Sequence, residues 1–180
     1  FSSVILTGII LAVGLTTICM HGDIYLGAID ILKAFGVVAL GSISATSIFM
    51  IVVLFLKSVS ASGAFFGLLS AVSGFIIGAY IPISQFSEAI QTICNIFPAS
   101  QITIVLRNVL INGLLEHMNT TLDGVDQGMF VTSIKELFSF KARLFDGYFD
   151  MRQMLVYIVV SIVICIVVQI LVYSKTYKKA

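Results

Sequence analysis

The sequence predicts an all-α integral membrane protein with about four transmembrane helices, a re-entrant helix pair and one external loop. Of its 180 residues, 59 % are hydrophobic and 11 % are charged, whereas a soluble domain carries roughly 25 % charged residues. The mean hydropathy of +1.11 agrees with this bias. A soluble fold would have too few polar side chains to cover its surface, so the bilayer is the expected solvent.

Long stretches without charged side chains mark the expected spans. A membrane-spanning helix needs roughly 20 apolar residues, and a charge at mid-membrane costs roughly 2.5–3.5 kcal/mol on insertion scales. Uncharged stretches lie before Asp23, and between Lys33 and Lys57, Lys57 and Glu88, and Arg152 and Lys175. The spans predicted from them are residues 4–20, 34–56, 61–81 and 154–173, within one transmembrane domain covering residues 1–180.

The first residues differ from a signal peptide. Phe1 is not Met, and the apolar segment that it opens has neither a basic leader nor a small-residue cleavage site. We therefore interpret residues 4–20 as a true span, and we expect spans N-terminal to Phe1 to be missing from this sequence.

The orientation is predicted from the lysines. The turn at residues 57–60 and the tail at residues 174–180 contain Lys57, Lys175, Lys178 and Lys179 and no acidic residue, while all nine acidic residues fall on the other side. Basic residues favour cytoplasmic flanks, so this turn and the C-terminus are expected in the cytoplasm. The other side holds more basic residues in total, six against four, but the rule weighs short flanks.

Two apolar segments separated by a proline follow the third span. Residues 83–97 alternate apolar and polar side chains at helical spacing, with Ser84 as a candidate N-cap and Glu88 early in the helix. Pro98 ends this run, and a second apolar segment carries Arg107 near its middle. We expect a re-entrant pair over residues 83–115. The alternative is two amphipathic helices lying flat on the membrane.

The most polar stretch comes next. Residues 116–151 are predicted to form an external loop with one short amphipathic helix near residues 133–145.

A stripe of small residues follows one face of the third span. Gly63, Gly67, Ser70, Gly74 and Gly78 recur every three or four residues and include two GxxxG pairs. Such stripes allow close helix packing, and a helix packed in this way can slide during a conformational cycle. Static packing, or glycine content alone, is the alternative.

The sequence gives no sign of an enzyme. Cys19, Cys94 and Cys165 lie far apart without metal-type spacing, and buried free thiols are expected. No phosphate loop, HExxH or GxSxG motif is present. No ionisable residue occupies the centre of a span, which argues against a proton- or sodium-driven carrier. We expect no catalytic residue, bound cofactor, metal or nucleic-acid partner.

One ordered set of motifs carries a resemblance. The chain reads Lys57-Ser-Val-Ser-Ala-Ser62, a glycine-rich run from Gly63 to Gly78, Tyr80-Ile-Pro-Ile83, Glu88-Ala-Ile-Gln91, Phe97-Pro-Ala-Ser-Gln101 and Leu106-Arg107. In this order, residues 57–112 resemble the permease of ABC-type-2 exporters. The flanking spans match mainly by order and length, and the long loop hardly at all.

The resemblance implies the C-terminal four of six spans in a permease subunit. Such permeases pair as homo- or heterodimers, bind two ATPase subunits that hold ATP and Mg, and move substrate by alternating access. The coupling helix to the ATPase would lie N-terminal to Phe1. The re-entrant pair would form an external gate, shaped here by Pro82, Glu88, Pro98 and Arg107. Substrates of the family include drugs, antibiotics, peptides, lipids and glycans.

Arg107 is the most unusual charge in this reading. Because it lies in an apolar run, we expect it to reach a lipid headgroup, a water-filled vestibule or an acidic partner such as Glu88 or Glu116. Plain snorkelling to lipid phosphate is the alternative.

The predicted function is therefore that of an ATP-driven exporter permease in a bacterial plasma membrane, with lipid, an ATPase and a second permease copy as partners. The alternative is a non-transporting assembly factor or sensor that binds a partner through residues 116–151. A neighbouring ATPase gene with Walker motifs would discriminate between them. A membrane-embedded enzyme is disfavoured, because no cluster of His, Asp or Glu lies within membrane depth.

Overall fold

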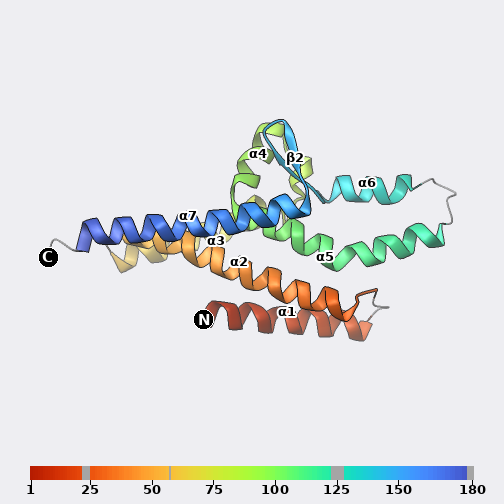
Figure 1. Ribbon diagram of the computed structural model, residues 1–180, viewed down its shortest axis with the longest axis horizontal. Helices are drawn as coiled ribbons and strands as arrows, with labels where there is room; N and C mark the ends of the chain where they lie inside the picture. Colours follow the sequence, from red (N-terminus) through yellow and green to blue (C-terminus); the bar gives the residue numbers. More distant parts are fainter. Residues whose placement is uncertain (22–24, 57, 123–127, 178–180) are drawn as a thin grey trace.

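The computed structural model describes residues 1–21, 25–56, 58–122 and 128–177, and these residues form a helical protein (Figure 1). They contain seven α-helices, one 3-10 helix and one two-stranded antiparallel hairpin. The predicted all-α class is confirmed. In chain order the elements are α1 (Ser2–His21), α2 (Ala28–Phe55), α3 (Val59–Ile76), η1 (Ile83–Gln85), α4 (Glu88–Ile96), α5 (Pro98–Thr121), α6 (Met129–Leu137), β1 (Ala142–Leu144), β2 (Gly147–Phe149) and α7 (Met151–Tyr177).

Four helices are long and apolar enough to cross a membrane. They cover Ser2–Met20, Ala28–Phe55, Val59–Ile76 and Met151–Lys175, with mean hydropathies from 1.7 to 3.1. Most of their large apolar side chains point outward, which is expected where lipid is the solvent. The chain is a multi-span membrane protein.

All four helices differ somewhat in their bounds from the prediction. α1 (Ser2–His21) and α7 (Met151–Tyr177) extend beyond the predicted residues 4–20 and 154–173 at both ends. The other two differences have a clear local cause. α2 begins at Ala28 rather than at residue 34, because Lys33 Nζ and Asp30 Oδ1 pair at 2.9 Å in its first turns and leave no isolated charge there. α3 ends at Ile76 rather than at residue 81. Gly78 follows with a φ of +70°, a left-handed conformation that ends helices and that glycine adopts without strain.

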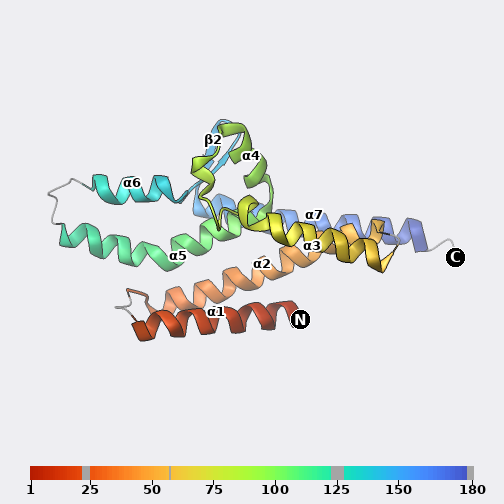
Figure 2. The same ribbon diagram turned by 180° about the vertical axis from the view of Figure 1, so that it is seen from behind.

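α2 is the central helix of the bundle and contacts α1, α5 and α7. The hydroxyls of Thr7 on α1 and Ser42 on α2 hydrogen-bond at 2.7 Å, and Gln169 Nε2 on α7 donates to Ser47 O at 2.6 Å. Figure 2 shows α1 beside the N-terminal half of α2 and α3 near its other end. The main apolar cluster joins α2, α5, β1 and α7 through Val37, Ile104, Val105, Ala142 and Met154.

The polar segment after α5 folds back along it. α6 and the residues that follow it pack on α5 through the buried side chains of Leu115, Val131 and Phe140. The predicted helix near residues 133–145 is only partly correct, because α6 ends at Leu137 and the hairpin follows. Ser139 has a φ of +53°, which turns the chain out of the helix.

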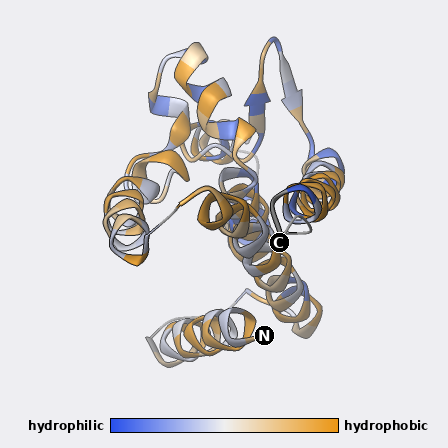
Figure 3. Cartoon of the chain, turned by 90° about the vertical axis from the view of Figure 1, so that its left-hand side faces the viewer, coloured by the Kyte–Doolittle hydropathy of each residue, from blue (hydrophilic) through white to orange (hydrophobic). Residues whose placement is uncertain are grey.

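α4 and the hairpin form a unit that we call the cap. α4 meets α5 at a bend of 95°, and the expected bent helix pair is confirmed. In Figures 1 and 3 the cap projects from one side of the bundle, with α4 and the β-hairpin side by side. The strands pair Ala142 with Phe149 and Leu144 with Gly147.

Candidate functional site

The bend between α4 and α5 is built around Pro98. Pro98 is buried and is the first residue of α5, a position where the missing N–H costs no hydrogen bond. Ser100 Oγ lies 3.0 Å from Ile76 O and 2.6 Å from Cys94 O, within hydrogen-bonding distance of both carbonyls. One hydroxyl therefore links the ends of α3 and α4 to the first turn of α5. Pro82 precedes η1, where its φ of −55° suits the ring.

Arg107 on α5 connects the ends of two other helices. Its Nη2 donates to Gly78 O at 3.1 Å, just beyond α3. Its Nη1 donates to Phe138 O, and lies 3.5 Å from Ser139 O, at the end of α6. Carbonyls at helix C-termini lack intrahelical partners and carry partial negative charge. We call this arrangement, in which the guanidinium joins the Gly78 and Phe138 carbonyls, the Arg107 clasp.

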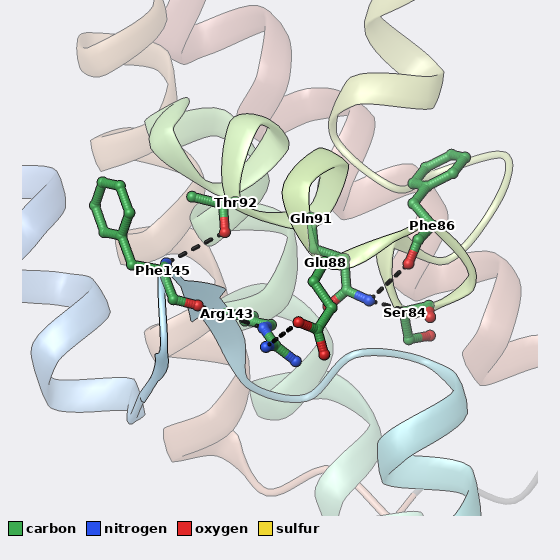
Figure 4. Close-up of polar contacts among 7 residues, drawn as sticks. All are labelled: Ser84, Phe86, Glu88, Gln91, Thr92, Arg143 and Phe145. Atoms are coloured by element: carbon green, nitrogen blue, oxygen red, sulfur yellow. Dashed lines mark hydrogen bonds and ion pairs between the residues drawn. The ribbon is translucent and has the colours of Figure 1, made fainter.

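The acidic partners suggested by the sequence do not contact Arg107. The carboxylate of Glu88 pairs with the guanidinium of Arg143 on β1 at 2.8 Å (Figure 4). Glu116 accepts from Asn112 Nδ2 at 2.8 Å. Of the three expected environments, backbone carbonyls take the place of the acidic partner. Contact of Arg107 with a lipid headgroup or a water-filled vestibule stays a prediction.

Gly78 has two reasons to be glycine. Its φ is +70°, and a Cβ at this position would lie 2.7 Å from Ile83 Cγ1. The Gly78 carbonyl is also an acceptor of the Arg107 clasp. A side chain here would therefore disturb both the turn after α3 and the clasp.

The small-residue stripe is shorter than predicted. Gly78 lies beyond α3, and Gly74 lies against the ring of Tyr80, so these two glycines shape the turn. Ideal Cβ positions at Gly63 and Gly67 have no described atom within 4 Å, and Ser70 is exposed. Close packing of Gly63 and Gly67 against another helix stays a prediction.

Hydrogen-bonding groups of η1, α4 and α5 hold the segment between α6 and α7. Ser84 N donates to Ser139 Oγ at 2.8 Å, and Asn108 Nδ2 donates to Phe140 O at 2.9 Å. Further along the same segment, Phe145 N donates to Thr92 Oγ1 at 3.2 Å (Figure 4). Several of these bonds reach backbone atoms, so they fix the path of the segment with little dependence on its side chains.

A buried amide pair lies beneath the cap. Asn95 Nδ2 donates to Arg143 O at 3.0 Å, and Gln101 Nε2 donates to Asn95 O at 2.8 Å. The two side chains are 1 % and 0 % exposed. Buried hydrogen bonds of this kind are costly to break, so the amides fix the hairpin on α4 and α4 on α5.

The hairpin and its Arg143 were not predicted from the sequence. Asp146-Gly147, between aromatic residues, is a recognised hairpin signal. It would have placed the turn within one residue of the observed loop, Phe145-Asp146, which joins the paired residues Leu144 and Gly147. Nothing in the sequence marks the carbonyls of Gly78 and Phe138 as acceptors, because every residue has one.

Other predicted features occupy separate places. Lys175 is in the last turn of α7, whereas Lys57, Lys178 and Lys179 lie outside the described residues. Among the described residues, no group of three or more His, Cys, Asp or Glu side chains could hold a metal ion.

A largely apolar pocket of about 560 Å³ lies between α5 and α6, lined by His117, Met118, Thr121, Leu122 and Phe130.

Comparison with known protein families, with curated proteins and with solved structures finds no match for this chain.

Proposed function

We propose that this chain is the permease subunit of an ATP-driven exporter of the ABC-type-2 class. The support from the sequence is the order of motifs between residues 57 and 112, which runs from the start of α3 into α5. The support from the fold is a set of apolar spans followed by a helix pair bent by 95°.

The observation that carries the proposal is the Arg107 clasp. A guanidinium on α5 bonds to carbonyls that directly follow α3 and α6, so a single side chain couples the end of a spanning helix, the bent pair and the segment beyond it. In an exporter, these are the parts that have to move together when the outer gate opens. We propose that the clasp forms in one state of the transport cycle and breaks in the other.

The remaining parts of the proposal concern the assembly. ATP and Mg would bind to a separate ATPase subunit, and two permease copies would enclose the pathway. The C-terminus of α7, with Lys175, would face the cytoplasm of a bacterial cell. Pro82, Glu88, Pro98 and Arg107 would belong to the external gate.

The test is co-expression of the full-length protein with the ATPase encoded beside its gene. The proposal predicts that the two subunits copurify and that the permease changes the rate of ATP hydrolysis. A Walker-motif variant of the ATPase that cannot hydrolyse ATP is the control. If no neighbouring ATPase binds the permease, the non-transporting assembly factor or sensor becomes the better account.

A further inference from the structure

α4 is an amphipathic helix whose polar face points into the protein. Asn95 is 1 % exposed and bonds to the hairpin, and Gln91 and Thr92 make their hydrogen bonds on the same side (Figure 4). Glu88, the only charged residue of α4, pairs with Arg143 at the exposed N-terminal end of this face, where the Glu88 side chain is 74 % exposed. In a water-soluble protein the apolar face of a helix packs inward, so α4 is inverted with respect to that pattern.

The outward face of α4 is apolar. Ile90, Ile93, Ile96 and, at the helix end, Phe97 are 45 %, 58 %, 45 % and 45 % exposed. Spacings of three and four residues place these side chains on one side of the helix. Full burial of such a side chain stabilises a protein by roughly 1.5–3 kcal/mol relative to exposure of the side chain to water. Contact of this face with an apolar medium is therefore favoured over contact with water.

The C-terminal end of α4 is fixed at the depth of the spans. Tyr157 Oη on α7 donates to Ile96 O at 2.7 Å, and Ser100 Oγ joins Cys94 O to Ile76 O at the end of α3. Tyr157 lies about 9 Å along α7 from Met151, at 1.5 Å per residue, inside the apolar span. The exposed face of α4 is therefore continuous with the apolar surfaces of two spanning helices.

The direction of α4 fits a position along the membrane. Figure 1 shows α4 projecting sideways from α7 and α5 rather than continuing their direction. A short helix that leaves a spanning bundle sideways, with an uncharged apolar face, has the geometry of an interfacial helix.

We infer that the face formed by Ile90, Ile93, Ile96 and Phe97 binds the acyl chains of one membrane leaflet. The polar face of α4 carries the hairpin, so the cap is anchored in lipid on one side and in the protein on the other. This inference depends on the fold alone and stands whether or not the chain transports a substrate.

The experiment uses a tryptophan-free background, and the 180 residues of this sequence contain no tryptophan. Ile93→Trp is reconstituted into phosphatidylcholine vesicles with or without bromine on the acyl chains, and bromine quenches tryptophan that it contacts. Val163→Trp on the outer side of α7 (54 % exposed) is the lipid-facing control, and Phe140→Trp (6 % exposed) is the interior control. The inference predicts that Ile93→Trp is quenched to the extent of Val163→Trp, and more by bromine near the headgroup than by bromine at the chain ends.

Quenching of Ile93→Trp only as weak as that of Phe140→Trp would overturn the inference. Cross-linking between two copies of Ile93→Cys would then identify the face as an interface with a second chain. If the tryptophan variant does not fold, spin-labelled Ile93→Cys gives the same decision. The rate at which the spin label collides with oxygen is compared with its rate of collision with a water-soluble nickel chelate. A higher rate with oxygen supports lipid contact, and a higher rate with the chelate contradicts it.

Discussion

The guanidinium of Arg107 donates a hydrogen bond from Nη2 to the carbonyl oxygen of Gly78 at 3.1 Å. Arg107 lies in the third turn of α5, whereas Gly78 lies in the turn after α3. The same guanidinium reaches the end of α6 through Nη1. A planar group with several donors can serve both carbonyls at once, which a single ammonium group cannot do with the same geometry.

Arg107→Lys should therefore weaken the clasp although it keeps the charge. Each hydrogen bond that involves a charged group contributes roughly 1.5–3 kcal/mol, so the loss of one contact should lower the midpoint of thermal unfolding and reduce efflux. Arg152→Lys, at the exposed start of α7, is the matched control and should behave as wild type. A wild-type melting midpoint and wild-type efflux from Arg107→Lys would leave snorkelling to lipid phosphate as the role of this arginine.

Gly78→Ala should destabilise the fold. An L-residue in the left-handed region costs about 1–2 kcal/mol, and the new Cβ would lie 2.7 Å from Ile83 Cγ1. Gly63→Ala is the control, because it lies inside α3 with no described atom within 4 Å of its Cβ position. That change should be neutral or stabilising by up to about 1 kcal/mol. The measurement is the midpoint of thermal unfolding of each variant in detergent. Equal shifts for Gly78→Ala and Gly63→Ala would contradict the assigned left-handed turn at Gly78.

Asn95→Asp should release the cap. The change replaces the Nδ2 donor to Arg143 O with a buried oxygen that repels that carbonyl. A lost buried hydrogen bond costs about 1–3 kcal/mol, and more where a charge is left unpaired. Asn112→Asp near the surface, where Glu116 is the only partner shown, should have a smaller effect. Protease cleavage within residues 142–149 is the readout, and an unchanged rate for Asn95→Asp would contradict the role of Asn95.

The orientation can be tested with single cysteines. In a background without Cys19, Cys94 and Cys165, Thr121→Cys should react with an impermeant maleimide in whole cells, and Ser174→Cys should not. Permeabilised cells provide the control, because Ser174→Cys should then react. Labelling of Ser174→Cys but not Thr121→Cys in intact cells would reverse the proposed topology.

The sequence predicts the spans well because each follows from the absence of charge over a bilayer thickness. It also locates the bent pair, since Pro98 interrupts two apolar runs. The hairpin escaped prediction because each strand has only three residues, too few for an alternating pattern to be seen. Its left-handed loop position is Phe145, with a φ of +53°, and not a glycine that would mark the turn. The partners of Arg107 were not predicted because they are backbone carbonyls at helix ends. Which carbonyls are free to accept is decided by the residue at which each helix stops. Ser139, with its own φ of +53°, sets that end for α6.

The central claim of the proposal is that this chain is a permease that moves substrate only with an ATPase, and that the proposed outer gate depends on Arg107. The most direct measurement is ATP-dependent efflux of a fluorescent drug panel from vesicles that contain the full-length permease with or without its neighbouring ATPase. The account predicts efflux with wild-type permease, ATPase and ATP together, and its loss when the ATPase is omitted or when Arg107→Lys replaces the wild type. Efflux that persists without the ATPase would contradict the exporter assignment.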